Sequence, residues 1–524
     1  MSSIRTRFLF SVAANVVRAA ISLVVGLLVA RGLGPNDYGN LAYLLGSFWA
    51  IRALLDMGSS SAFYTFIAQR ARGGYYYLVY FSWLAFQLLF SVMLVALLLP
   101  QAILERFWLG QARELILLAL LATFLQNQVW QTVVQIHEAA RKTVRVQVAG
   151  GVVVLAHLVL VGSMIAGQWL SVQAVMWAIV GEYAVVAAWL SVTLRKSIDI
   201  HGVYSFAAEK THEDLRTVVQ AYFHYCRPMF VVAVFSFFYE MADRWLLQRY
   251  GGASQQGFYQ VAAQLSTVSL LATSSILNIF WKEIAEANDR GVHERVAGLY
   301  LKTTQALVFL ASVVSCFLAP WAKLLVDLLL GGAYASAWPV LCMMLFYPIH
   351  QAVGQINGTL FMATGRNSTY MVISVAGLLL SIPVSYVMIA PKVESGFGGL
   401  ELGALGLALK IFGLNFLSVN LQSWLISRYY KIKFQWRYQM GAIFLLLVLG
   451  YACRLVADQF LTLIAPSLDV PAKVVTLIGM VSAGLLYLLG LLMILMRMPK
   501  LAGMEHGEVL GILGKFAAWH PRRG

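Results

Sequence analysis

The chain of 524 residues is 60% hydrophobic and only 12% charged, about half the charged share of a soluble protein. Lys and Arg number 38 against 23 Asp and Glu. We interpret this excess as the bias of cytoplasmic loops in a membrane protein rather than as a nucleic-acid surface, because the sequence has no zinc-finger spacing and no glycine-rich phosphate loop.

Long apolar runs along the whole chain predict an all-α polytopic membrane protein with about 14 transmembrane helices. The first run is too long for the core of a signal peptide, so we expect it to remain as a helix. Most connections between the runs are short, as is usual in helix bundles. To within a few residues, the expected spans are 8–30, 40–66, 76–100, 113–136, 147–167, 172–193, 221–246, 257–281, 297–319, 335–362, 369–390, 400–426, 440–464 and 473–496.

The polar segment 194–220 divides these spans into two groups. It predicts a cytoplasmic linker between an N-lobe, 1–193, with spans one to six and a C-lobe, 221–426, with spans seven to twelve. Two extra spans fill 427–496. The tail, 497–524, is too short and too interrupted to cross a membrane, and its apolar spacing fits either a short helix on the cytoplasmic face or a mobile tail.

Lys and Arg concentrate in alternate connections between the expected spans. With the N-terminus placed inside, the inside segments hold several times as many of these residues as the outside loops. Because cytoplasmic loops carry the excess of positive charge, both ends of the chain are expected in the cytoplasm. The two lobes then share one orientation.

An internal repeat supports the two lobes. The turn after the first span reads ARGLGPNDYGNLA, and the turn after the seventh reads QRYGGASQQGFYQ. Glycines suit the tight exit from one helix and the entry into the next, so these positions are expected to act as turns or hinges in two parallel repeats. The alternative is a chance match between loop glycines. At one constant offset, the matching residues are Arg31, Gly34 and Gly39 in the first turn and Arg249, Gly252 and Gly257 in the second.

Two arginines lie deep in the first pair of spans. At about 1.5 Å per residue, Arg18 is roughly 15 Å into the first span and Arg52 roughly 18 Å into the second, near the middle of the hydrocarbon core. A charge at that depth is costly and marks a functional site by default. We expect both arginines to line one cavity, with Asp56 paired to Arg52 one helical turn away. The alternative is a structural ion cluster.

Further charged residues lie in the other spans. In span seven, Arg227 either lines the cavity or extends its side chain to the cytoplasmic surface. Glu240 and Arg244 are one turn apart, whereas Asp243 has no partner nearby in the sequence. Glu182 in span six and Lys410 in span twelve are also deep and have no partner at that spacing. The candidates for ion coupling or for pairing between the lobes are Glu182, Glu240, Asp243, Arg244 and Lys410.

No pattern indicates catalysis. The histidines His157, His224 and His350 are scattered, without a second ligand at the spacing of a metal site. There is no nucleophile elbow and no Walker A motif. We therefore expect a protein that is not an enzyme and has no catalytic residue, metal site or cofactor.

The first pair of spans, with ARGLGPNDYG followed by LLDMGSSSAF, and the segment MADRWLLQRYGGASQQGFYQVAA resemble the polysaccharide transporter (Wzx-type) flippases of the multidrug/oligosaccharidyl-lipid/polysaccharide exporter superfamily. Weaker matches follow at LLGGAYASAWPVL and FMATGRNSTY. The resemblance implies two six-helix lobes around a central cavity and two extra C-terminal helices. It also implies that Arg18 and Arg52 are cavity arginines, and that Asp243 and Arg244 occupy the Asp-Arg position of span seven. Glu240 departs from that pattern, which leaves ion coupling there open.

The resemblance implies a flippase of the cytoplasmic (inner) membrane that exports a polyprenyl-diphosphate-linked oligosaccharide for surface lipopolysaccharide or exopolysaccharide, by alternating access through a cationic cavity. Its expected partners are that lipid-linked glycan, membrane lipids and polysaccharide polymerase machinery, with no nucleic acid. The first alternative is a cation- or proton-coupled multidrug antiporter of the same fold, whose site should be rich in unpaired acids. The second is a membrane glycan polymerase or ligase, which should carry a larger outside domain than any loop of this chain offers.

Overall fold

The computed structural model describes residues 4–69, 72–201, 214–270, 280, 283–392, 398–464, 472–508 and 511. Regular structure in these ranges is helical throughout, with no strand. Eleven of the helical segments are long and apolar enough to cross a membrane. The chain is therefore an all-α, multi-pass membrane protein.

The total of 14 spans stays a prediction. The first of the eleven segments, Ala14–Asp56, has 43 residues, which is about 65 Å of helix and twice the thickness of a hydrocarbon core. It holds most of the first expected span, 8–30, and most of the second, 40–66. The segments expected as spans seven and eight do not meet the same criterion of length and apolar composition among the described residues.

Contacts divide the chain into two units. The first unit comprises residues 1–260 and 381–404. Its helices include three π-helical turns, η1, η2 and η3. They are α1 (Ile4–Asp56), α2 (Ser59–Gln69), α3 (Gly74–Met93), η1 (Leu94–Leu98), α4 (Gln101–Phe107), α5 (Arg113–Phe124), η2 (Leu125–Val129), α6 (Trp130–Ala139), α7 (Thr143–Ala166), α8 (Val172–His201), α9 (Leu215–Leu246), η3 (Leu247–Gly251) and α10 (Ala253–Ser266).

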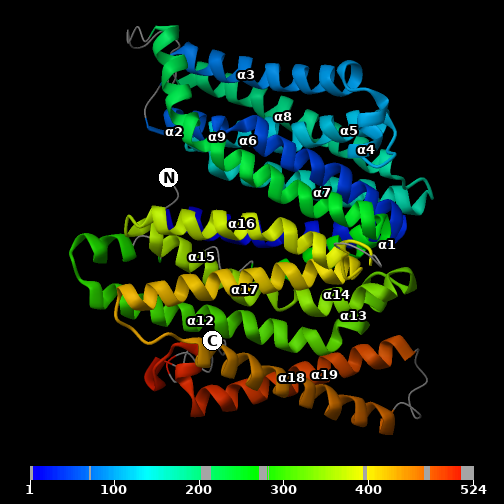
Figure 1. Cartoon of the computed structure of the whole chain (residues 1–524), viewed down its shortest axis with the longest axis vertical. Coiled ribbons are helices and arrows are strands. Elements are labelled where there is room, and N and C mark those ends of the chain that lie inside the picture. The colour runs from blue at the N-terminus through cyan, green and yellow to red at the C-terminus, as the bar shows by residue number, and fades with distance from the viewer. Residues whose placement is uncertain are drawn as a thin grey trace, which may run out of the picture. The chain divides into compact units, whose positions relative to one another are not determined.

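The second unit comprises residues 261–380 and 405–524. Within it, α12 packs against α15 and α18, and α18 lies beside α19 (Figure 1). The helices that begin in the second unit, together with α17, are η4 (Thr267–Leu270), α12 (His293–Leu318), η5 (Ala319–Trp321), α13 (Ala322–Leu329), η6 (Gly332–Ala337), α14 (Trp338–Met344), α15 (Tyr347–Ala363), α16 (Asn367–Ile389), α17 (Gly403–Tyr429), α18 (Trp436–Ile464), α19 (Ala472–Arg497) and η8 (Pro499–Ala502).

The expected linker is partly helical. Helix α8 continues to His201, and α9 already begins at Leu215, so both enter the segment 194–220. Residues 202–213 lie outside the described part of the chain. The lobe boundaries predicted from the sequence stay predictions, because the two contact units follow a different division of the chain.

The packing of the first unit follows from the apolar faces of its helices. Helix α1 packs against α5, α7 and α9. Beside it, α2, α3 and α9 bury an aromatic cluster in which the rings of Phe63 and Tyr80 are stacked 4.1 Å apart. The Tyr80 hydroxyl lies 3.0 Å from that of Thr132 on α6. This cluster packs α2 against α6, and both helices contribute to the cavity described below.

The second expected span is interrupted, contrary to the continuous helix 40–66. Helix α1 ends at Asp56, where Met57 and Gly58 have φ values of 47° and 83°, and α2 starts again at Ser59. Two successive residues with positive φ cannot continue an α-helix. The stretch DMGSSS at the break has the glycine and serines of a turn, but the apolar runs on both sides of it together have the length of one span, so a continuous helix was expected.

The two glycine turns have the same backbone conformation. Gly34 has φ 76° and ψ 170°, and Gly252 has φ 82° and ψ 171°. Five residues after each turn the chains touch reciprocally. A Cβ at Gly39 would overlap the carbonyl of Ala253, and a Cβ at Gly257 would overlap that of Pro35. A reciprocal contact of this kind is the mark of a local two-fold relation.

Candidate functional site

The first unit contains an open cavity of about 810 Å³. It lies among α1, α2, α5, η2, α6, α8, α9 and α10, and its described lining includes two arginines but no aspartate or glutamate. Most other lining residues are amides, hydroxyl-bearing residues and tryptophans. The lining consists of Tyr38, Leu41, Ala42, Leu45, Gly46, Trp49, Arg52, Ser60, Ser61, Thr123, Gln126, Asn127, Trp130, Gln131, Gln135, Tyr183, Arg244 and Gln260.

Arg52 is the first cation of the cavity lining. Its guanidinium lies over the ring of Trp49, 5.3 Å from the ring centre. Its Nε is buried and has no hydrogen-bond partner among the described residues. A cation–π contact supports the guanidinium but leaves its N–H groups available to an anion.

Arg244 is the second cation. Its Nη1 donates a hydrogen bond of 3.3 Å to the carbonyl of Gly46, and its Nη2 is 4.0 Å from Oε2 of Glu240. A Cβ at Gly46 would lie 2.6 Å from Arg244 Nε, so the glycine makes room for the guanidinium. The long separation from Glu240 means that the carboxylate compensates the charge of Arg244 only in part.

Asp56 does not pair with Arg52, which corrects the expectation from their spacing. Its Oδ1 accepts hydrogen bonds from the Ser59 hydroxyl at 2.9 Å and the Ser60 amide at 3.1 Å, and its Oδ2 accepts one from the Ser60 hydroxyl at 2.9 Å. Among the described residues, no ion pair joins it to Arg52. Because α1 ends at Asp56, its carboxylate is free to cap the N-terminus of α2, where it also meets the positive end of the helix dipole.

The other two arginines expected in the cavity lie outside its lining. The Arg18 Nη2 donates to Asn15 at 2.7 Å, and its guanidinium packs against Gly150 of α7. Arg227 is exposed on α9. The structure therefore brings Arg52 together with Arg244 rather than with Arg18.

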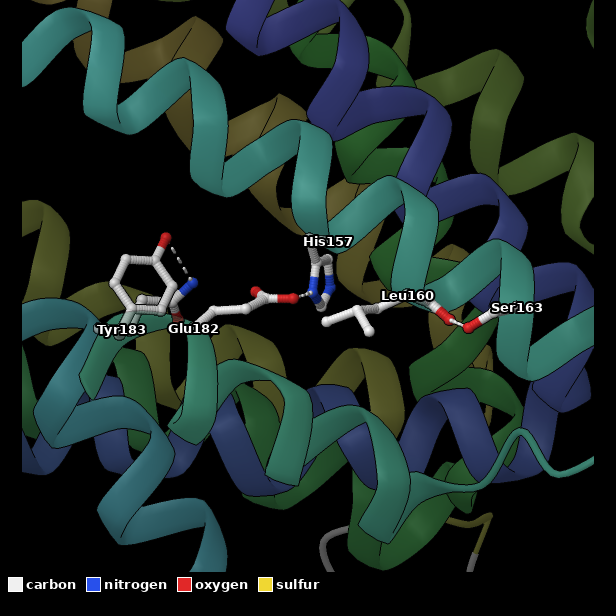
Figure 2. Close-up of polar contacts among 6 residues, drawn as sticks. His157, Leu160, Ser163, Glu182 and Tyr183 are labelled. Carbon is white, nitrogen blue, oxygen red and sulfur yellow. Dashed lines mark hydrogen bonds and ion pairs between the residues drawn. The ribbon is translucent and has the colours of Figure 1, made fainter. Parts of the chain in front are cut away.

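Glu182 has a partner that lies far from it in the sequence. Figure 2 shows its Oε1 directed at His157 on the neighbouring helix α7, 2.9 Å from Nδ1. The Glu182 side chain is only 7% exposed. The next residue, Tyr183, lines the cavity and accepts a hydrogen bond of 3.4 Å from Gln126 Nε2. The pair therefore lies one residue from the cavity wall without being part of it.

Two more of the expected charged residues are buried. Asp243 accepts a hydrogen bond of 2.5 Å from the hydroxyl of Ser385, so it has a partner on α16. Lys410 is buried in α17, in the second unit. Neither residue lines the cavity. No cluster of His, Cys, Asp or Glu in the described chain could hold a metal ion.

The sequence analysis missed the amides of the cavity. Gln126, Asn127, Gln131 and Gln135 all line it, and all come from the segment of η2 and α6. A detectable signal was present, because polar residues recur at helical spacing within an otherwise apolar span. The amides were not predicted because they are uncharged and the site residues were expected among the charged ones.

Residues 5–281 match the model of a family described as "Polysaccharide biosynthesis protein". Among solved structures, the lipid II flippase MurJ in an inward closed conformation is similar with a TM-score of 0.65 at 14% identity, covering 94% of this chain and 99% of that chain. An inward-facing multidrug resistance transporter of the MATE family and MOP superfamily gives 0.62 at 15% identity, covering 79% and 96%. A MOP superfamily transporter from Pyrococcus furiosus, whose title reports a binding pocket of reverse polarity, gives 0.54 at 15%, covering 81% and 94%.

These likenesses show that the chain has the fold of MOP superfamily transporters. No protein with a curated description matches the sequence.

Proposed function

The chain belongs to the family of polysaccharide biosynthesis proteins, and from this premise we propose that it exports a polyprenyl-diphosphate-linked oligosaccharide. The cargo would cross the cytoplasmic membrane by alternating access through the cavity of the first unit and enter the assembly of surface polysaccharide. Both ends of the chain would lie in the cytoplasm.

One observation carries this proposal: the cavity is lined by Arg52 and Arg244 and by no described acid. A diphosphate brings about two negative charges, which need compensation away from bulk water. The planar guanidinium fork suits phosphate oxygens better than an ammonium does. In this proposal Arg244 takes the place that the sequence suggested for Arg18.

The remaining lining fits the rest of the cargo. Amides and hydroxyl groups can hydrogen-bond a glycan, and Trp49 and Trp130 offer apolar ring faces. The polyprenyl tail needs no polar cavity and can stay in the hydrocarbon of the bilayer, where apolar groups are at no disadvantage.

A cation-coupled multidrug antiporter is the second candidate, since a MATE transporter shares the fold. The buried acids Glu182 and Asp243 would be its coupling sites. A cationic drug in the cavity, however, would lie beside two arginines with no acid in the described lining to offset them. The charge of the cavity therefore favours an anionic cargo.

The arginines give a direct test. Arg52→Gln should lower the affinity of purified protein for a polyprenyl diphosphate by about tenfold or more, because charge-assisted hydrogen bonds contribute about 1.5–3 kcal/mol each. Arg52→Lys should retain part of the affinity, since the charge survives without the fork. Arg106→Gln, which removes an exposed arginine from α4 of the same unit, is the matched control.

The same variants should be compared in vesicles for transfer of the labelled lipid across the bilayer. Loss in Arg52→Gln with unchanged folding and an active Arg106→Gln supports the proposal. Full transfer by Arg52→Gln, or preferential binding of a lipophilic cation by the wild type, would contradict it. The lipid-linked glycan, membrane lipids and polysaccharide polymerase machinery are the partners proposed here, and no nucleic acid is among them.

A further inference from the structure

We propose that the amide-bearing segment of η2 and α6 is a separate glycan-reading surface, which selects neutral or acidic sugars rich in hydroxyl and acetamido groups. This inference rests on the proposed function and divides its cavity into two subsites. Arg52 and Arg244 hold the diphosphate, and Asn127, Gln131 and Gln135 contact the sugars attached to it. The amides would therefore set specificity for the glycan and contribute little to binding of the lipid diphosphate itself.

The first support is the hydrogen-bonding capacity that these side chains leave unused. Asn127, Gln131 and Gln135 make no side-chain hydrogen bond within the described chain, although all three line the cavity. Gln135 is 7% exposed, and its Oε1 is buried without a donor. Burying a polar oxygen without a hydrogen-bond partner costs free energy, and a donor group on a bound molecule would remove that cost.

The second support is the type of group that is unpaired. An esterified diphosphate at neutral pH offers oxygen acceptors and no hydrogen to donate. It can use the N–H groups of arginine, but it cannot satisfy an amide oxygen such as Gln135 Oε1. Sugar hydroxyls and acetamido N–H groups can donate to that oxygen, and the same hydroxyls can accept from an amide NH₂. A phosphate can use only the NH₂ groups of these amides, whereas a glycan can use both their NH₂ groups and their oxygens, so the glycan is the better match.

The third support is the helix geometry that presents the amides. The π-helical turn η2, Leu125–Val129, joins α5 to α6 without leaving the helical path. Such turns are rare inside α-helices and are frequent at functional sites. Here Gln126 and Asn127 line the main cavity, whereas the next residue, Gln128, faces a smaller pocket and bonds to Gln87 at 3.1 Å.

An aromatic pair holds this surface in place. The ring of Trp130 meets that of Tyr183 edge-on, with centres 5.9 Å apart, and the Tyr183 hydroxyl accepts from Gln126 at 3.4 Å. Trp130 thus presents a fixed ring beside the amides in the cavity wall. Apolar sugar faces pack on such rings while the hydroxyls around them bond to polar side chains.

The charge of the cavity lining limits which classes of sugar the proposed surface can bind. The amides are neutral, the only described cations of the cavity are the two arginines, and no described acid lines it. A sugar with a free ammonium group would be repelled by Arg52 and Arg244 and would find no carboxylate. Neutral and acidic sugars meet no such penalty.

The test compares two probes on purified full-length protein: a polyprenyl diphosphate without sugar, and the same lipid carrying a neutral disaccharide with one N-acetyl group. The wild type should bind the second probe more tightly. The double variant Asn127→Leu/Gln131→Leu should bind the sugar-free probe within about twofold of wild type, but the glycan probe about tenfold more weakly, as expected for two lost hydrogen bonds. The effect should therefore be selective for the sugar.

The matched control is Gln87→Leu/Gln128→Leu. It also exchanges two amides for leucines, but these two bond to each other and do not line the main cavity; they line the smaller pocket on the other side of Arg52 and Thr123, which both pockets share. Replacing both partners of a buried hydrogen bond can be nearly neutral. This control should bind both probes as the wild type does.

Three outcomes would overturn the assignment. If Asn127→Leu/Gln131→Leu lost affinity for both probes equally, the amides would act on the diphosphate or on folding. If it lost no affinity for either probe, the amides would not contact the glycan. In both cases the wild type still binds the lipids, and the proposed function stands. Failure of the wild type to bind either probe would overturn the proposed function, and this inference with it.

Discussion

At the scale of single residues, local backbone geometry decides which charges meet. Arg52 and Asp56 have the spacing of a helical ion pair, yet α1 ends at Asp56 and the carboxylate turns to the serines of α2. Three hydrogen bonds at the positive end of a helix satisfy a buried carboxylate more completely than one contact with a guanidinium. As a result Arg52 stays available to the cavity.

This arrangement predicts a ranking for Asp56 variants. Asp56→Ala should lower the free energy of unfolding by about 1–2 kcal/mol, because the cap of α2 is lost. Asp56→Asn should cost less, since the amide oxygen can still accept from Ser60. The thermal unfolding midpoint of the purified variants measures both.

Arg52→Gln is the comparison for that ranking. It should leave the unfolding midpoint near that of wild type, because Asp56 does not depend on the guanidinium. Equal destabilisation by Arg52→Gln and Asp56→Ala would instead indicate an ion pair between them.

At the scale of helices, the two repeated turns bring backbone against backbone. Gly39 lies on Ala253, and Gly257 lies on Pro35, so neither glycine has room for a side chain. Helices approach this closely in membranes where small residues line the contact, because dispersion contacts replace the hydrophobic effect there. The repeat read from the sequence is thus also a packing contact inside the first unit.

We predict that Gly39→Ala lowers the amount of folded protein in the membrane more than Gly181→Ala does. The added methyl overlaps a carbonyl at residue 39 but meets nothing within 4 Å at residue 181, in α8. Neither glycine has a positive φ, so the comparison isolates space from backbone strain. Quantifying folded protein by fluorescence-detected size exclusion gives the readout, and equal yields of both variants would argue against a close contact at residue 39.

The positions of most helices could be predicted from the sequence, because an apolar run of about 20 residues has the length and composition of a transmembrane helix. The break after Asp56 could not, because the glycine and serines of DMGSSS are typical of a turn but the apolar runs on both sides together have the length of one span. Nor could the pairing of Glu182 with His157, which depends on how α7 packs against α8. The depth of Arg52 in its span is visible in the sequence, whereas its place in one cavity lining with Arg244 depends on how α1 and α9 pack.

At the scale of the whole molecule, the distribution of charge along the chain determines how it inserts into the membrane. The Lys and Arg excess falls in the segments expected inside, and this asymmetry orients membrane proteins. Described helices cover most of the expected spans, and the connections between them carry that charge.

Orientation can be measured with reporter fusions. A reporter at Lys210 or after Arg497 should be active on the cytoplasmic side, and one inserted near Gly110 or Lys392 on the opposite side. Fusions at all four sites in one vector background control for expression. A reporter at Lys210 that reads as external would contradict both the orientation and the cytoplasmic linker.

The contact between the two glycine turns also has a consequence for the order of synthesis. Gly39 leaves the ribosome long before Gly257, and at about 5–20 residues per second the gap is roughly 10–45 seconds. During that time the first hairpin is already in the bilayer, but the backbone of Ala253 that covers Gly39 has not yet been made. Whatever covers this surface in the meantime has to leave it when α10 arrives. This contact inside the first unit cannot form until about half of the chain has been translated.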